Sequence, residues 1–131
     1  VFHSVNGIGW EPRTAEELEE YFGYIDQRKD QLLVATFADV TKYIIERKNA
    51  IVRSAVEEDA ILVTIDNDLD PSVYDVPVTL KTYVPSTWLS AKLFKGSQQE
   101  SKLGLEIRKD PIGSFVMYSV MPEEHEITLT E

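Results

Sequence analysis

Cysteine is absent from this chain of 131 residues, which excludes disulfide bonds and thiolate metal sites within it. Basic residues are few: 13 lysines and arginines stand against 23 aspartates and glutamates, and the net charge is -10. A phosphate backbone or an anionic membrane surface would repel such a chain, so we expect neither nucleic acid nor membrane as a partner. No apolar run approaches the roughly 20 residues that a membrane-spanning helix needs.

Apolar residues make up 43% of the chain, enough for a hydrophobic core and too many for a disordered segment. The length suits one domain or two small ones. The first residue is Val1 rather than methionine, and no basic-then-apolar leader follows it. Because Val1 already stands in a strand-like pattern, we expect the chain to be a piece of a longer protein.

The first thirty residues combine a strand pattern with a helix pattern. Val1–Val5 alternates like a strand, and a loop with two glycines and a proline follows it. Thr14 and Glu17 match a capping box, which predicts a helix that begins there and fades near residues 28–30. Four apolar residues at helical spacing are expected to form its buried face: Leu18, Tyr21, Phe22 and Ile25.

A second strand and a second helix are expected next. Gln31–Phe37 reads as a short buried strand, and Thr36–Asp39 repeats the capping-box pattern. The helix should end near Asn49, with its last turn, Glu46, Arg47 and Lys48, in solvent. Its buried residues are expected to be Phe37, Val40, Tyr43 and Ile44. The order strand, helix, strand, helix predicts that residues 1–50 belong to a (β/α) barrel or a parallel sheet.

From Ala50 onward the apolar period changes to two, which indicates strands. About seven are expected, at Ile51–Val56, Ala60–Ile65, Val76–Val84, Trp88–Phe94, Leu103–Ile107, Phe115–Val120 and Glu126–Thr130. Their spacing of roughly ten residues predicts a small antiparallel β-sandwich over residues 51–131. The expected fold class is therefore α+β, an N-terminal fragment of a (β/α) barrel followed by a β-sandwich.

His3 is the first candidate for chemistry. A histidine at a strand end beside a glycine-containing loop stands where α/β folds place catalytic groups, although a lone strand histidine is more often structural or exposed. His125 falls in a polar turn, and the two histidines are not at metal-ligand spacing. Asp66–Asp70 offers oxygen ligands at alternate positions, but it lacks the glycine and the distal glutamate of a calcium loop, which favours a solvated turn.

The aromatic residues form a second group of candidates. Trp10 and Trp88, together with Tyr83 and Tyr118, could stack on the apolar faces of sugar rings. Packing in the core or between domains is the alternative for each of them.

Several stretches carry a family resemblance through their order and spacing. His3–Val5, Trp10–Pro12, Leu33–Val40 and Tyr43–Arg47 resemble the closing segment of the polysaccharide deacetylase family, carbohydrate esterase family 4. Tyr74–Thr82 and Val84–Trp88 resemble a β-rich C-terminal extension found on some bacterial members. The resemblance implies a distorted (β/α) barrel that hydrolyses N- or O-acetyl groups on glycans, and a secreted or periplasmic protein.

The same resemblance implies roles for particular residues. His3 matches the general acid of the family, which protonates the leaving amine or alkoxide. The zinc or similar divalent metal of the complete enzyme would be held by an aspartate and two histidines upstream of this chain, so the chain alone is expected to be inactive. Trp10 and Trp88 are the expected substrate-binding residues.

Two functions follow as hypotheses. The first is the C-terminal portion of a metal-dependent polysaccharide deacetylase, with a barrel end at 1–50 and an accessory β-sandwich at 51–131. The alternative is a non-catalytic carbohydrate-binding or interaction β-sandwich. The expected partners are a polysaccharide and either the upstream part of the same parent protein or a second copy of this chain, because a truncated barrel exposes apolar faces.

Overall fold

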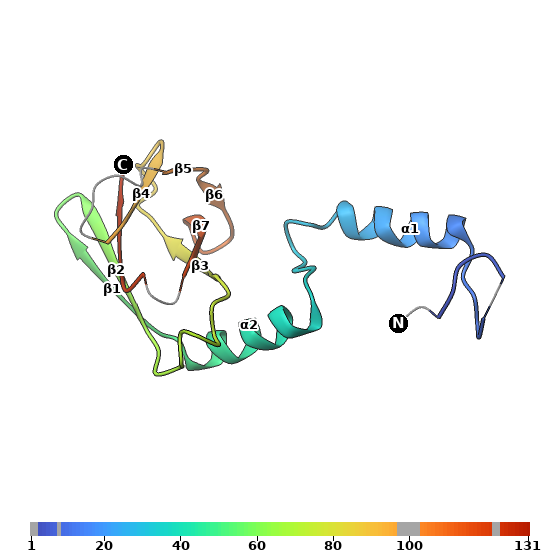
Figure 1. The fold of residues 1–131 in the computed structure, drawn as a ribbon. Coiled ribbons are helices and arrows are strands. Elements are labelled where there is room, and N and C mark those ends of the chain that lie inside the picture. Colours follow the sequence, from blue (N-terminus) through green and yellow to red (C-terminus); the bar gives the residue numbers. More distant parts are fainter. Residues whose placement is uncertain (1–2, 8, 97–102, 122–123) are drawn as a thin grey trace. The chain divides into compact units, whose positions relative to one another are not determined.

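The computed structural model describes residues 3–7, 9–96, 103–121 and 124–131. The chain divides into two compact units, Val1–Thr36 and Phe37–Glu131. Within these described residues, two helices precede eight strands (Figure 1). The sequence pattern places a domain boundary after residue 50. The division into compact units falls after Thr36 instead, so the second helix belongs to the same unit as the strands.

The first unit contains helix α1, Ala15–Asp26, whose start is fixed by the predicted capping box. The Thr14 hydroxyl accepts a hydrogen bond from the Glu17 amide at 3.1 Å, and the Glu17 carboxylate accepts one from the Thr14 amide at 3.0 Å. These two bonds satisfy amide groups that have no partner within the helix. The prediction of a helix beginning after Thr14 is therefore confirmed.

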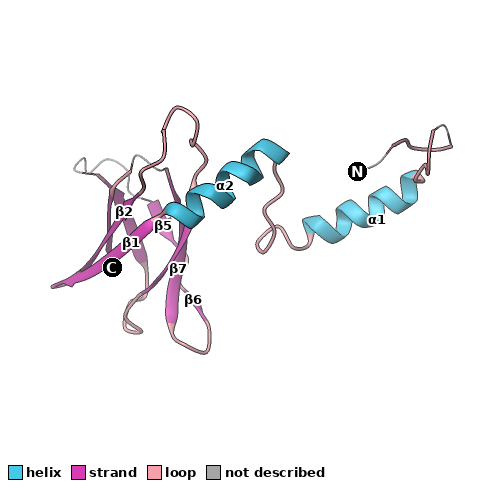
Figure 2. Ribbon diagram, turned by 90° about the horizontal axis from the view of Figure 1, so that it is seen from below, coloured by secondary structure: helices cyan, strands magenta, loops and turns pink. Residues whose placement is uncertain are grey.

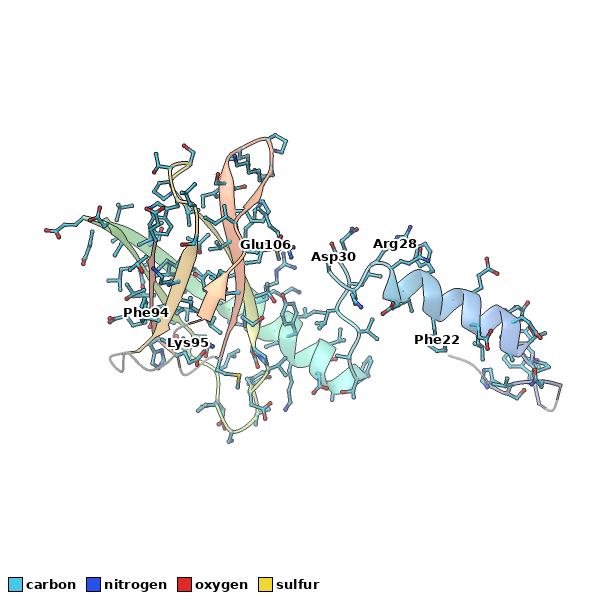
Figure 3. The ribbon with its side chains drawn as sticks, turned by 90° about the horizontal axis from the view of Figure 1, so that it is seen from above. Phe22, Arg28, Asp30, Phe94, Lys95 and Glu106 are labelled. Atoms are coloured by element: carbon cyan, nitrogen blue, oxygen red, sulfur yellow. The ribbon has the colours of Figure 1, made fainter. Side chains whose placement is uncertain are left out.

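The predicted buried face of α1 is wrong. No residue of the helix is buried, and Tyr21, Phe22 and Tyr24 are each at least half exposed. Figure 3 shows the Phe22 side chain projecting from the helix. An amphipathic pattern predicts an apolar face but does not supply the element that covers it.

The prediction of a (β/α) barrel fragment is also wrong. Within the expected strand Val1–Val5, residues 1–2 lie outside the described residues, and the remainder forms only one bridge, between Val5 and Arg13. The expected strand Gln31–Phe37 has no regular structure from residue 32 to residue 36, and Val34 is 68% exposed. A buried strand needs a neighbouring strand on each side. In the described part of this unit there is no sheet to provide one.

The second unit begins with helix α2, Phe37–Asn49, which ends where Asn49 was expected to end it. Its packing differs from the predicted pattern, because Phe37 is 89% exposed and Glu46 is completely buried. The Glu46 carboxylate accepts a hydrogen bond from the Val76 amide at 3.1 Å, and Lys42 pairs with Asp75 at 2.6 Å. Polar contacts therefore hold α2 against the segment that leads into the third strand.

The strands form two antiparallel sheets (Figure 2). Their bounds are β1 Ile51–Glu57, β2 Ala60–Asp66, β3 Val78–Tyr83, β4 Ala91–Lys95, β5 Leu103–Leu105, β6 Arg108–Lys109, β7 Ser114–Val120 and β8 Glu126–Thr130. One sheet has the order β1-β2-β8-β4-β5 and the other has the order β3-β7-β6. The predicted fold, a barrel fragment followed by a β-sandwich, is therefore wrong for the barrel part, because the fold consists mainly of two antiparallel sheets. The β-sandwich part of the prediction fits.

The core lies between the two sheets. Alternate residues of β2 and β8, such as Val63, Ile65 and Leu129, are almost fully buried against Val116 and Val120 of β7. These apolar side chains alternate with exposed or half-buried ones along β2 and β8, whereas β7 begins with three buried residues, Ser114–Val116, before it alternates. Burying one large aliphatic side chain stabilises the fold by about 1.5–3 kcal/mol, and this hydrophobic effect is the main force that holds the two sheets together.

Candidate functional site

Strand β8 presents hydroxyl groups on the outer face of the five-stranded sheet. Ile127 and Leu129 are fully buried, whereas the intervening Thr128 and Thr130 are only partly buried. Because side chains alternate across a strand, both threonines point away from the core. They form the floor of the candidate site.

One end of this floor is aromatic. Phe94 of β4 is the cross-strand partner of Thr128, and both alternate with buried neighbours along their strands, so both side chains lie on the outer face. Phe94, Gly96, Thr128 and Thr130 line a hollow of about 280 Å³. Gly96 has a positive φ of 63° and no atom within 4 Å of the position a Cβ would take, so this side of the hollow stays open.

The other end of the floor contains Trp88. A second hollow, of about 480 Å³, is lined by Glu57, Glu58, Asp59, Ala60, Trp88, Thr130 and Glu131. Thr130 lines both hollows, so they adjoin along β8. We call the surface from Phe94 through Thr128 and Thr130 to Trp88 the β8 groove.

Trp88 is held in place by the sandwich itself. Its side chain is partly buried and packs against the core cluster, while its remaining surface lines the hollow. The Trp88 amide donates to the Pro85 carbonyl at 3.1 Å, and the next amide, of Leu89, donates to the Glu131 carboxylate at 2.9 Å. The indole therefore packs against the core, as one of the two alternatives for Trp88 expected, and its remaining surface lines a hollow, while sugar stacking stays a prediction.

His3 and Trp10 come together in the first unit. Their ring centroids are 5.1 Å apart in an edge-to-face arrangement, and both side chains are exposed. The loop that carries them is closed by backbone hydrogen bonds from Asn6 to Arg13 and from Arg13 to Ser4, at 2.9 and 3.1 Å. The structure thus pairs two of the three residues predicted as site residues, while Trp88 lies in the other unit.

The remaining candidates have structural partners. His125 Nδ1 lies 3.3 Å from the Ile65 carbonyl. In the acidic run, the Asp70 carboxylate accepts hydrogen bonds from the amide and hydroxyl of Ser72, and Asn67 accepts one from the Leu69 amide. These oxygens cap turns, as the solvated-turn interpretation requires.

A divalent metal does not fit the residues that the structure describes. Among them there is no group of three or more histidine, cysteine, aspartate or glutamate side chains that could hold one. The zinc ligands implied by the family resemblance would have to come from outside these described residues.

Phe94, Thr128 and Thr130 were missed by sequence reasoning. The alternation of Glu126–Thr130 indicates that the two threonines share a face, and that signal was available. Their position beside Phe94 depends on the pairing of β4 with β8, which the local pattern does not contain.

The chain is similar to part of a much longer known protein. A 95-residue stretch is 29% identical to gellan lyase from a Bacillus species; the match covers 67% of this chain and 4% of that protein. No protein-family model and no solved structure matches the chain.

Across the described residues, the helices are too short or too polar to cross a membrane.

Proposed function

We propose that the chain is an accessory module of a larger extracellular polysaccharide-processing protein and that its β-sandwich binds glycan in the β8 groove. The observation that carries the proposal is the pair of adjoining hollows, which share Thr130 and have Trp88 and Phe94 at their ends. Aromatic faces pack against the apolar faces of sugar rings, and hydroxyl groups between them supply hydrogen bonds.

The position of the groove supports binding by a surface that is already formed. It lies on strands whose opposite faces form the core, so its floor is rigid before a ligand arrives. A rigid surface loses little conformational entropy on binding. The match to part of gellan lyase supports a polysaccharide as the ligand class.

Mutation of the two aromatic ends tests the proposal. Affinity electrophoresis would use gellan, neutral hydroxyethyl cellulose and amine-bearing glycol chitosan. We expect Trp88→Ala and Phe94→Ala each to weaken binding about fivefold or more, as truncation of a central aromatic contact does. Leu89→Ala is the matched control, because Leu89 is 93% exposed and does not line either hollow.

Two outcomes would contradict glycan binding by the groove. The first is that the wild-type chain is not retarded by any of the three polysaccharides. The second is that Trp88→Ala and Phe94→Ala bind as the wild type does while their circular dichroism and melting curves show folded protein.

A second candidate function is glycan deacetylation in the complete parent protein, favoured by the contact between His3 and Trp10. An exposed imidazole 5.1 Å from an exposed indole could donate a proton to a leaving amine or alkoxide while the indole stacks on the sugar. This hypothesis needs an upstream metal site, since the described residues do not form one.

The full parent protein tests this candidate. If His3 is the general acid, His3→Ala abolishes acetate release while glycan binding persists, and Trp10→Ala raises KM more than it lowers kcat. Unchanged acetate release by the His3→Ala parent protein would exclude this role. Glycan binding that survives His3→Ala but is weakened by Trp88→Ala assigns the binding to the sandwich.

A further inference from the structure

The outer face of the three-stranded sheet carries an aromatic pair of its own. Tyr83 of β3 and Phe115 of β7 are cross-strand partners, with ring centroids 6.1 Å apart in an edge-to-face arrangement. Val116 and Tyr118 of β7 point into the core, so Phe115 lies on the opposite face of the sheet, where its ring is itself buried (9% exposed) beneath its neighbours, and Met117 on the same face is 40% exposed. Tyr83 is 39% exposed.

Tyr83 is held in one orientation by several contacts. Its hydroxyl donates to Asp110 Oδ2 at 2.9 Å, and the Lys81 ammonium donates to the same oxygen. Asp110 Oδ1 in turn accepts the amides of Ile112 and Gly113 at 2.8 and 3.0 Å. The ring is therefore ordered before any ligand binds, which lowers the entropy cost of stacking.

Lys81 completes the surface around the rings. Its ammonium lies 4.0 Å from the Phe115 ring centroid and 4.9 Å from that of Tyr83. Further along the same strands, the hydroxyl oxygens of Thr79 and Ser119 are 3.5 Å apart. One continuous face thus has an exposed ring at one end, hydroxyl groups at the other and an ammonium between them.

The charges on this face cancel, which identifies the kind of ligand it suits. Lys81 is paired with Asp110, and Arg108, whose cross-strand partner is Phe115, is paired with Glu106 at 3.2 Å. A phosphate or a nucleic acid would need uncompensated cations. An uncharged sugar needs only a flat ring and a few hydrogen-bonding groups, and this locally neutral face of a chain with net charge -10 provides them.

We infer that the outer face of the three-stranded sheet, centred on Tyr83 and Lys81, is a second glycan-binding site for uncharged polysaccharide. It goes beyond the groove proposed above. The two sites lie on opposite outer faces because the core separates the sheets. One sandwich then bridges two glycan chains, or binds one long chain with the added affinity of two linked contacts.

The test uses the whole chain and hydroxyethyl cellulose as the neutral probe, with binding measured by affinity electrophoresis and bridging by light scattering. We expect Tyr83→Ala to keep binding through the groove and to lose bridging. A Trp88→Ala/Phe94→Ala protein should keep measurable binding, and Tyr83→Ala added to it should weaken that binding about fivefold or more. Ile112→Ala is the control, because Ile112 is 80% exposed on the adjacent turn.

A second variant covers the case in which Tyr83→Ala fails to fold. Met117→Glu places a charge on the same face without touching the core, and it should also abolish bridging. Bridging by folded Tyr83→Ala or Met117→Glu at the wild-type level overturns the inference. Complete loss of binding in the Trp88→Ala/Phe94→Ala protein also overturns the second site. That result would still agree with glycan binding by the β8 groove. Unchanged binding in that protein, with loss in Tyr83→Ala, supports this site and contradicts the groove.

Discussion

The carboxylate of Glu46 is buried completely and accepts the backbone amide of Val76 at 3.1 Å, thirty residues further along the chain. This bond attaches the last turn of α2 to the segment that enters β3. A carboxylate on a helix is usually solvated, because taking its charge out of water is costly. Here the side chain acts as a tether between a helix and a strand.

Glu46→Ala tests the tether. The substitution leaves the partly buried Val76 amide without this acceptor, and we expect the free energy of unfolding to fall by about 1–3 kcal/mol. Urea denaturation followed by circular dichroism measures the change. Glu46→Gln, which keeps an acceptor oxygen, should lose less than Glu46→Ala. Arg47→Ala, on the exposed side of the same turn, should stay within about 0.5 kcal/mol of the wild type.

Asp110 should make stability depend on acid pH. The hydrogen bond from Lys81 holds the pKa of Asp110 well below its usual range, with the amides of Ile112 and Gly113 adding to the effect. A carboxylate with a lowered folded-state pKa stabilises the protein above its unfolded value of about 3.9, and that contribution is lost as the pH falls toward the folded value. Asp110→Asn should therefore be less stable at pH 7.

The measurement is the urea midpoint of the wild type and of Asp110→Asn between pH 7 and pH 2.5. The difference between the two proteins should be constant above about pH 5 and should shrink below about pH 4. A difference that stays constant over the whole range would contradict the assigned pairing with Lys81.

Adjacent residues of β8 should separate stability from binding. Leu129 is fully buried, so Leu129→Ala should cost about 2–5 kcal/mol through lost packing and a cavity. Thr128 faces outward, so Thr128→Ala should leave the thermal midpoint nearly unchanged while weakening glycan binding. If Thr128→Ala unfolds the protein, or if Leu129→Ala is tolerated, the assignment of faces is wrong.

The capping box of α1 can be tested by replacing its threonine. Thr14→Ala removes the acceptor of the Glu17 amide, and we expect a loss of helix stability of about 1 kcal/mol. Amide hydrogen exchange in Ala15–Leu18 should become faster. Thr14→Ser keeps a hydroxyl acceptor and should preserve the wild-type exchange rates.

Features with local causes could be predicted from the sequence. The alternation in β2 and β8 predicted the sandwich because each strand shows its own inward face, as Val63 and Leu129 do. Thr14 and Glu17 predicted the start of α1 because the bonds involved span only three residues. Leu33 and Val34 led to the wrong prediction of a buried strand. An apolar run shows that a segment would be stabilised by a neighbouring strand, but it does not show that such a strand exists.

The candidate site was predicted in part, for the same reason. Trp88 could be named as a ring able to stack on sugar, since that property belongs to the side chain itself. The sequence could not predict that Phe94 and Thr128 lie side by side, because their pairing requires β4 to lie next to β8, a strand more than thirty residues later. Glu46 and Val76 show the same limit within the fold.

Strand β1 stands at the edge of the five-stranded sheet, and all seven of its residues are exposed. Val52 and Val56 occupy core-facing positions of that strand but are 48% and 77% exposed. An uncovered, β-branched edge is a template on which another copy can add a strand. In concentrated preparations β1 is therefore the place where ordered aggregation would start, and the charged Arg53 and Glu57 are the residues that oppose it.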